Sequence, residues 1–213
     1  GLLRDPKAVD DILGILREES PSLFTVKMRI GFDDDRHFDT LLGLLAKHNV
    51  DLLSLHVRTV RGGYRSEPSY LHARHAVDRL PCPVLLNGNI YSAKIAHEEV
   101  IKSGAHGVMI GRAAIRNPWI FRQIRQMQAN EKVFQPMLED AYVYVEELYE
   151  EFGTWLKHEI KEGTACIISS SEEGFKAIGL KHSKKVQVYN GNLDCSFRTY
   201  RVFEGKRKEN LIK

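Results

Sequence analysis

Two short apolar segments, each closed by a glycine-containing turn, constrain the fold of this chain more than any other feature. Residues 83–90 read Pro-Val-Leu-Leu-Asn-Gly-Asn-Ile, and residues 107–112 read Gly-Val-Met-Ile-Gly-Arg. An apolar, partly β-branched run of this length is typical of a buried parallel strand. Two such strands, with one helix between them, are how a β/α barrel builds a phosphate site from its last two loops. The pair therefore indicates a phosphorylated cofactor.

Strands and helices alternate along the first half of the chain, and the strands start roughly 23–31 residues apart. This alternation predicts right-handed βαβ units and a parallel sheet. The expected strands are residues 24–30, 51–57, 83–86 and 108–110, and the expected helices are residues 35–48, 69–80 and 92–103. A complete barrel needs roughly 250 residues. We therefore expect an α/β fold: a partial (β/α)8 TIM barrel with about four of the eight βα units, followed by a small helical domain and a divergent tail.

The remainder of the chain has a different character. Helical periodicity marks residues 119–124 and 137–156, and it fades after His158. Two later β-rich runs are compatible with a hairpin around residues 190–194. The sequence thus predicts three segments: the partial barrel over 1–117, a helical domain over 118–157, and a basic tail over 158–213.

Charge is unevenly distributed between the body of the chain and its tail. Residues 1–152 carry 19 Lys and Arg against 21 Asp and Glu, and residues 153–213 carry 12 against 7. In the tail, Lys and Arg residues alternate with Tyr189, Phe197, Tyr200 and Phe203. Cations among aromatic side chains suit RNA. A solvated hairpin is the alternative, and it is the favoured interpretation of this cluster.

The cysteines, at positions 82, 166 and 195, are far apart and form no CxxC pair. We therefore expect neither a disulfide framework nor a zinc site. We expect a reducing, cytoplasmic location. No apolar run reaches 18 residues, so we expect no membrane span. The opening residues have no apolar core typical of a signal peptide, and the chain begins without Met, as if partway through a longer protein.

Polar residues at strand ends are the candidate site residues. Lys27 and Arg29 alternate on one strand and so share a face. A cation there can hold the electron-rich edge of a flavin or a substrate carbonyl, although a salt bridge is an equal alternative. His56 ends the next strand and is followed by Arg58. Active sites of β/α barrels form at such carboxyl ends, although a lone histidine there is also often a satisfied structural residue.

The two glycine turns complete the candidate set. Asn87, Gly88 and Asn89 follow one strand, and Gly111 and Arg112 follow the next. Successive N–H groups in such turns can form an anion nest, which the arginine charge supports. Ordinary turns are the alternative, and two at consecutive strand ends are stronger evidence for a site than one.

These segments together resemble the tRNA-dihydrouridine synthases. The resemblance rests on residues 26–31, residues 56–59 with Tyr64, residues 87–90, and residues 108–119, whose order and spacing match the family. It covers about residues 1–156, and other FMN barrels share the phosphate turns but not the whole series.

The resemblance implies an FMN-bound barrel followed by a helical tRNA-binding domain, a monomer when intact. The family uses NADPH to reduce the flavin and then reduces uridines in tRNA to dihydrouridine. By similarity, Lys27 and His56 contact the flavin, and the residues of the glycine turns, Asn87 to Asn89 with Gly111 and Arg112, hold the FMN phosphate. Arg29 and Arg58 are expected to face the target base or its backbone.

One departure from the family concerns the general acid, a cysteine in an Asn-x-x-Cys-Pro segment before the strand that bears Lys27. No cysteine precedes Lys27 here, so we expect the catalytic cysteine upstream of residue 1 and expect this chain alone to be inactive. Cys82 precedes Pro83 but lies before the phosphate strand, so it is not assigned that role. Two alternatives stay open: another FMN barrel that reduces a small pyrimidine, and a degenerate, non-catalytic RNA-binding fragment.

Overall fold

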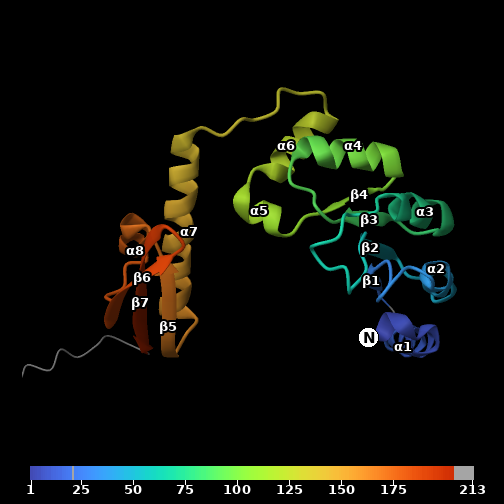
Figure 1. The fold of residues 1–213 in the computed structure, drawn as a ribbon, viewed down its shortest axis with the longest axis horizontal. Coiled ribbons are helices and arrows are strands. Elements are labelled where there is room, and N and C mark those ends of the chain that lie inside the picture. The colour runs from blue at the N-terminus through green and yellow to red at the C-terminus, as the bar shows by residue number, and fades with distance from the viewer. Residues whose placement is uncertain (21, 204–213) are drawn as a thin grey trace, which may run out of the picture. The chain divides into compact units, whose positions relative to one another are not determined.

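The computed structural model describes residues 1–20 and 22–203, and two compact units divide the chain. The first unit is Gly1–Phe134, and the second starts at Gln135. Each is described by itself below (Figure 1).

A four-stranded parallel sheet forms the centre of the first unit. Its strands are β1 (Thr25–Arg29), β2 (Leu52–His56), β3 (Val84–Asn87) and β4 (Gly107–Met109), paired in the order β1-β2-β3-β4. Helices α2 (Phe38–Lys47), α3 (Leu71–Arg79) and α4 (Ala93–Ser103) connect consecutive strands. The predicted α/β fold, a partial TIM barrel of four βα units, is confirmed.

Local signals in the sequence explain where these elements start and stop. Ser92 caps α4 by accepting a hydrogen bond from the backbone N–H of Ile95 at 3.2 Å. Gly104 ends the same helix at φ 71°, a conformation that glycine adopts without strain. Asn49 after α2 is also left-handed, at φ 50°. Turn chemistry, as well as apolar periodicity, therefore sets these element lengths.

The two faces of the parallel sheet differ in chemistry. One face packs against the helices and buries aliphatic side chains completely, including Leu53, Leu55, Val84 and Leu86. Each such side chain contributes about 1.5–3 kcal/mol through burial. The other face is more polar: there the hydroxyl of Ser54 donates to the sulfur of Met109 at 2.9 Å. The polar face is the inner side of a barrel wall.

Helices before and after the sheet complete the first unit. The short 3-10 helix η1 (Leu2–Arg4) and α1 (Pro6–Glu19) precede β1. Asp5 caps α1 by accepting hydrogen bonds from two backbone N–H groups, and Pro6 occupies the first turn. Helices α5 (Arg112–Arg116) and α6 (Ile120–Gln128) follow β4, and α6 packs against α4 and α5.

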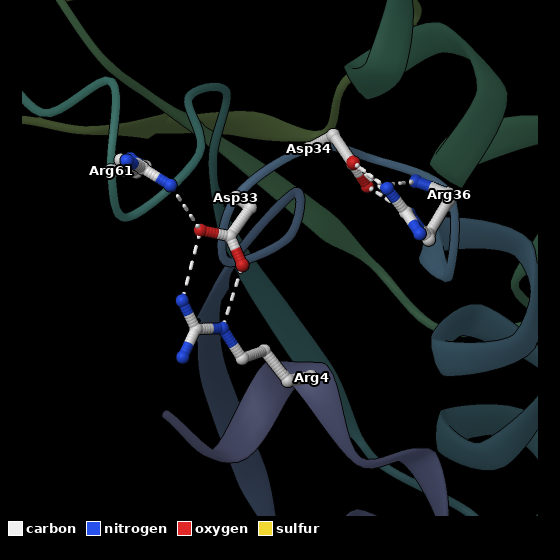
Figure 2. A network of polar contacts seen from close by, with 5 residues as sticks. All are labelled: Arg4, Asp33, Asp34, Arg36 and Arg61. Atoms are coloured by element: carbon white, nitrogen blue, oxygen red, sulfur yellow. Dashed lines mark hydrogen bonds and ion pairs between the residues drawn. The ribbon is translucent and has the colours of Figure 1, made fainter.

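Ion pairs fix the loops that follow β1 and β2. The carboxylate of Asp33 accepts from Arg4 at 2.6 and 2.9 Å and from Arg61 at 3.1 Å, while Asp34 pairs with Arg36 (Figure 2). The hydrogen bond from Arg4, with a smaller contribution from Arg61, lowers the pKa of Asp33 to about 2. The network thereby joins η1 to the loops at the carboxyl edge of the sheet.

The second unit is a helix-covered antiparallel sheet. Its elements are the long helix α7 (Leu138–His158), strand β5 (Glu162–Ser169), helix α8 (Glu172–Ala177), and strands β6 (Lys184–Asn190) and β7 (Leu193–Phe203). The strands pair in the order β5-β7-β6, with β7 in the centre. The hairpin expected around residues 190–194 is present as β6 and β7.

The core of the second unit is small and depends on close helix packing. Phe175, Ile178 and Tyr200 form its buried hydrophobic cluster. Gly153 of α7 lies against the backbone of Ile178, where an added Cβ would come within 2.1 Å of the carbonyl oxygen. Arg198 of β7 is also buried, and its guanidinium pairs with the carboxylate of Glu172 and lies 3.9 Å from the ring centre of Phe175.

Several expectations for the C-terminal part need revision. The sequence indicates no regular element between residue 158 and the hairpin, yet β5 and α8 form there. Arg198 and Tyr200, two of the residues that suggested RNA contact, are buried in the core, so neither presents a surface to RNA. Basic residues 206–208 lie outside the described residues.

The unit boundary also differs in position from the predicted segments. The expected helical segment, residues 118–157, contains both α6 and α7, but α6 belongs to the first compact unit and α7 to the second. Helix α7 packs against α8 and β7. The residues after 158 complete the core that α7 needs, which apolar periodicity alone does not indicate.

Candidate functional site

A single pocket at the carboxyl edge of the parallel sheet collects the candidate residues from all four strand ends. All nine of them line it: Lys27, Arg29, His56, Arg58, Asn87, Gly88, Asn89, Gly111 and Arg112. The remaining lining residues are Tyr64, Ile90, Tyr91, Met109, Ile110 and Ala113. Residues up to 85 positions apart in sequence meet here because parallel strands end at a common edge.

Strand β1 presents two cations to the pocket. Lys27 and Arg29 alternate with Val26 and Met28, which pack against the core. In the sheet register Lys27 lies beside Ser54, and Arg29 lies beside His56. Arg29 also donates to the carbonyl of Thr59 at 2.8 Å, which ties its guanidinium to the loop after β2. The predicted sharing of one face is confirmed.

His56 ends β2 in a buried, cationic environment. The residue is 7% exposed, and its Nδ1 atom has no hydrogen-bond partner within the described residues. Burial, followed by the positive charges of Arg29, Lys27, Arg58 and Arg112, lowers the pKa of His56 to about 4. The imidazole is therefore neutral at physiological pH and can exchange a hydrogen bond with a ligand.

Arg58 is held in place but not fully satisfied. It is 3% exposed, and its Nε atom donates to the carbonyl of Ser66 at 2.5 Å. Its Nη1 atom is buried without a partner among the described residues. An unpaired buried donor is costly, so this one indicates a ligand that accepts its hydrogen bond.

The turn after β3 has two consecutive residues with positive φ. Gly88 has φ 130°, which side-chain-bearing residues rarely adopt, and Asn89 follows at φ 51°. Hydrogen bonds hold both: the Tyr70 hydroxyl donates to the carbonyl of Gly88 at 3.0 Å, and the Tyr91 hydroxyl donates to the Asn89 side-chain oxygen at 2.6 Å. The fixed turn leaves a shallow, glycine-lined wall on the pocket.

The turn after β4 leaves open space. A Cβ atom added at Gly111 would meet no protein atom within 4 Å. Asn87 connects the two turns by donating to the carbonyl of Met109 at 2.7 Å. The neighbouring Arg112 is exposed, and its guanidinium lies 3.9 Å from the ring centre of Tyr64. The two glycine turns thus border one hollow.

Tyr64 is a pocket residue that the candidate set does not include. Its ring lies 6.3 Å from that of His56 in an edge-to-face arrangement, and it contacts the guanidinium groups of Arg29 and Arg112. The side chain is 64% exposed, which leaves its ring accessible from the pocket. In the sequence Tyr64 carries part of the family resemblance but no assigned role. The length of the loop after His56 does not predict that this loop folds back over the strand ends.

The charged side chains that line the pocket are all positive. Lys27, Arg29, Arg58 and Arg112 line it, and none of the lining residues is an Asp or Glu. Within the described ranges, none of these four cations forms an ion pair, whereas Arg4 and Arg61 nearby both pair with the carboxylate of Asp33 (Figure 2). Four uncompensated cations in one hollow of about 240 Å³ favour an anionic ligand.

No thiol lines this pocket. Cys82 is buried in the first unit, where burial raises the pKa of its thiol, and Cys166 and Cys195 lie on β5 and β7 of the second unit. Across residues 1–20 and 22–203, no three His, Cys, Asp or Glu side chains are grouped as metal ligands would be. In the same ranges, no helix combines the length and apolarity required to cross a bilayer.

Comparison with known proteins agrees with this geometry. A model of the family described as Dihydrouridine synthase (Dus) matches residues 1–170. The chain is 30% identical to a probable tRNA-dihydrouridine synthase of Rickettsia conorii over 151 residues, which cover 70% of the chain and 46% of that protein. It is 33% identical to tRNA-dihydrouridine synthase B of Pseudomonas syringae pv. tomato over 143 residues, covering 67% and 42%.

A third relative extends the match slightly further. The probable tRNA-dihydrouridine synthase of Rickettsia bellii is 31% identical over 161 residues, which cover 75% of the chain and 48% of that protein. The chain thus spans less than half the length of each of these relatives. Because the family model covers most of the chain and includes every pocket residue, the chain belongs to the dihydrouridine synthase family.

Proposed function

We propose that this pocket binds FMN and that the protein reduces uridines in tRNA to dihydrouridine, with NADPH as the reductant. The observation that carries the proposal is the convergence of nine candidate residues on one cationic hollow without a carboxylate. FMN has a phosphate and an electron-rich ring edge, both of which require hydrogen-bond donors.

The residues present fit this cofactor. His56 and Arg58 each have a buried polar atom without a partner in the described chain. At Gly88 an added Cβ would come within 3.3 Å of the Val57 side chain, whereas at Gly111 there is open space. The hollow is smaller than the roughly 300–1,000 Å³ of most ligand pockets. These residues are therefore suited to hold part of the cofactor rather than to enclose it.

Charge and backbone geometry suggest which part of the ligand each residue binds. We assign the phosphate to the backbone of Asn87 to Asn89, the open turn at Gly111, and the charge of Arg112. Lys27 and the neutral His56 are assigned to the flavin ring, and Arg29 and Arg58 to the target base or its backbone. Tyr64 supplies an exposed aromatic ring beside both arginines, suited to stacking on a planar group.

The bound flavin would supply the hydride for reduction of the uracil ring. Arg29 and Arg58 would stabilise negative charge on a carbonyl oxygen of the target base through charge-assisted hydrogen bonds. His56, being neutral, would orient its partner without adding a fifth charge. A proton is also needed at the neighbouring carbon, and no thiol lines the pocket. We therefore expect the 213-residue chain alone to form no dihydrouridine.

Two measurements test the proposal. In the first, FMN is titrated into the 213-residue chain, and saturable quenching of flavin fluorescence is expected. Absence of binding by a folded chain would contradict the cofactor assignment. The same preparation, incubated with NADPH and unmodified tRNA, should yield no dihydrouridine by nucleoside mass spectrometry, and measurable product would overturn the expected inactivity.

The second measurement tests the substrate. A chimera would carry this chain's matched residues in place of the corresponding segment of the Pseudomonas syringae relative. It should retain FMN and form dihydrouridine in unmodified tRNA. A folded, FMN-loaded chimera that reduces a free pyrimidine but not tRNA would show that the cofactor assignment is right and the tRNA assignment is wrong.

A further inference from the structure

Helix α7 carries a continuous apolar stripe that its own unit leaves exposed. The stripe residues follow one another at intervals of three and four: Leu138, Ala141, Val145, Leu148, Phe152 and Trp155. Exposure ranges from 37% for Phe152 to 69% for Leu138 among the large side chains. Alternating intervals of three and four are the pattern of a helix–helix seam.

The stripe borders the side of α7 that packs within the unit. Gly153 and Leu156 are the buried residues of the helix, and Tyr149 packs against the small core. Phe152 and Trp155 instead stack on each other with ring centres 5.9 Å apart while remaining 37% and 48% exposed. Large apolar side chains in a continuous exposed row are typical of an interaction surface.

A hollow of about 330 Å³ extends the stripe at the N-terminal end of α7. Leu138, Ala141, Tyr142 and Val145 form its apolar wall, and it is also lined by Ser171, which caps α8, and by Gly174 of α8. Glu146 and Glu173 also line it. Such a hollow is suited to one large apolar anchor with a cationic group beside it.

The charge of α7 determines what kind of partner can cover the stripe. The helix contains six Asp or Glu residues and one Lys, a formal charge of −5 with His158 neutral. Within the described part of the chain, none of the six carboxylates forms an ion pair. Glu151 borders the stripe on the helical wheel, and Glu147 lies one turn before Glu151 on the same side of the helix.

This charge disfavours two of the possible occupants. RNA phosphates would be repelled along the whole helix. The α7 helix of a second copy would place two charges of −5 against each other, and like charges across an interface weaken association. A basic partner would be attracted by the same negative charge on α7.

We propose that the stripe on α7 docks a basic amphipathic helix of another protein, with an apolar side chain in the hollow beside α8. The apolar seam would provide the buried area, and Lys or Arg residues flanking the partner's seam would pair with Glu146, Glu147 and Glu151. This surface is independent of the FMN pocket, so the proposal does not depend on the proposed reduction of tRNA.

The test uses the full 213-residue chain and a labelled synthetic helix of about three heptads, with Leu at the seam and Lys or Arg elsewhere. Fluorescence anisotropy should show saturable binding that weakens with added salt. Two control peptides are matched to it: a scrambled sequence of the same composition, and an acidic version with Glu in place of the cations. Equal binding of the scrambled peptide, or tighter binding of the acidic one, would overturn the proposal.

Surface variants locate the binding site. Leu148→Asp, in the stripe, should weaken binding by about tenfold or more, as for a central interface residue. The matched control is Val143→Asp on the same helix, which is 52% exposed but off the stripe and should change binding less than about twofold. Equal effects of the two substitutions would contradict the assignment. Glu147→Gln with Glu151→Gln should weaken binding and flatten its salt dependence.

Two further outcomes would assign the surface to a different occupant. Sedimentation of the chain across a concentration series should show no self-association through the stripe. Self-association that Leu148→Asp abolishes would mean that the stripe binds a second copy of this chain and would overturn the proposal. Binding of unmodified tRNA should be the same for Leu148→Asp and the parent chain. A selective loss of tRNA binding would make the stripe an RNA contact and overturn the proposal.

Discussion

Arginine has opposite roles in the two units of this protein. In the second unit, the buried Arg198 pairs with Glu172 and stacks over Phe175, so its charge is compensated within the fold. In the first unit, the buried Arg58 donates one hydrogen bond to a carbonyl and leaves Nη1 without a partner among the described atoms. The first arrangement is structural, and the second leaves a buried donor available to a ligand.

The difference shows which cations indicate a binding site. Basic residues in the sequence suggested function in both units, but charge compensation separates them. Even near the pocket, Arg4 and Arg61 share Asp33 and serve the loops rather than a ligand (Figure 2). No carboxylate of the described residues pairs with the pocket cations, so their mutual repulsion raises the free energy of the folded protein. A bound anion would reduce that repulsion.

The largest effect should come from removing exposed cations from the pocket. Lys27→Ala combined with Arg112→Ala should weaken FMN binding about 100-fold, because each loses a charge-assisted interaction worth roughly 1.5–3 kcal/mol. The thermal midpoint should not fall, since neither residue has an ion pair to lose within the described chain. Arg79→Ala, an exposed site on α3, is the control for FMN titration. Unchanged affinity in the double variant would contradict an anion site.

The next largest effect should come from removing the carboxylate in the second unit. Glu172→Ala leaves Arg198 buried without its partner, so the thermal midpoint should fall by about 5 °C or more. Glu173→Ala, one position along the same helix, serves as the control and should leave the midpoint nearly unchanged. If both variants melt at the same temperature, Arg198 is not compensated in the way described.

A smaller effect concerns the pH dependence of stability. His56 has a pKa of about 4 in the folded chain and near 6.5 when unfolded. The unfolded state therefore binds the extra proton first, and the free energy of unfolding should decrease as the pH falls from 6.5 to 4. His56→Gln should remove about 1–2 kcal/mol of this decrease in urea titrations. His97→Gln, the control, should leave the decrease unchanged. Identical pH profiles for the parent chain and both variants would show that the pKa of His56 is not lowered.

The smallest effect should come from Tyr64. Tyr64→Leu removes the aromatic face beneath Arg112, which should weaken FMN binding about threefold, as expected for an exposed cation–π contact. Tyr64→Phe keeps the ring and should bind as the parent does. A loss in the Phe variant equal to that in the Leu variant would assign the effect to the hydroxyl rather than to the ring.

The first unit could be predicted from sequence because its information is local. Apolar runs, the Ser92 cap and the left-handed Gly104 each indicate an element by themselves, and the parallel sheet then brings the strand ends together. Tyr64 could not be predicted as a pocket residue, because its position depends on how a long loop returns over the sheet.

The second unit was less predictable because its core is non-local. Tyr200 and Arg198 become buried only when β7 lies between β5 and β6 and beneath α8. In the sequence the same residues resemble the basic and aromatic surface of an RNA-binding hairpin. Burial of Arg198 also depends on Glu172, which lies 26 residues away.

The most direct test of the central claim, that the two glycine turns and Arg112 form a phosphate site, compares FMN with riboflavin, which lacks the phosphate. Both are titrated into the 213-residue chain under identical conditions. FMN should bind at least about tenfold more tightly, and Arg112→Ala should reduce that ratio, since the gain comes from charge-assisted bonds to the phosphate. Equal affinities for the two flavins would contradict the account.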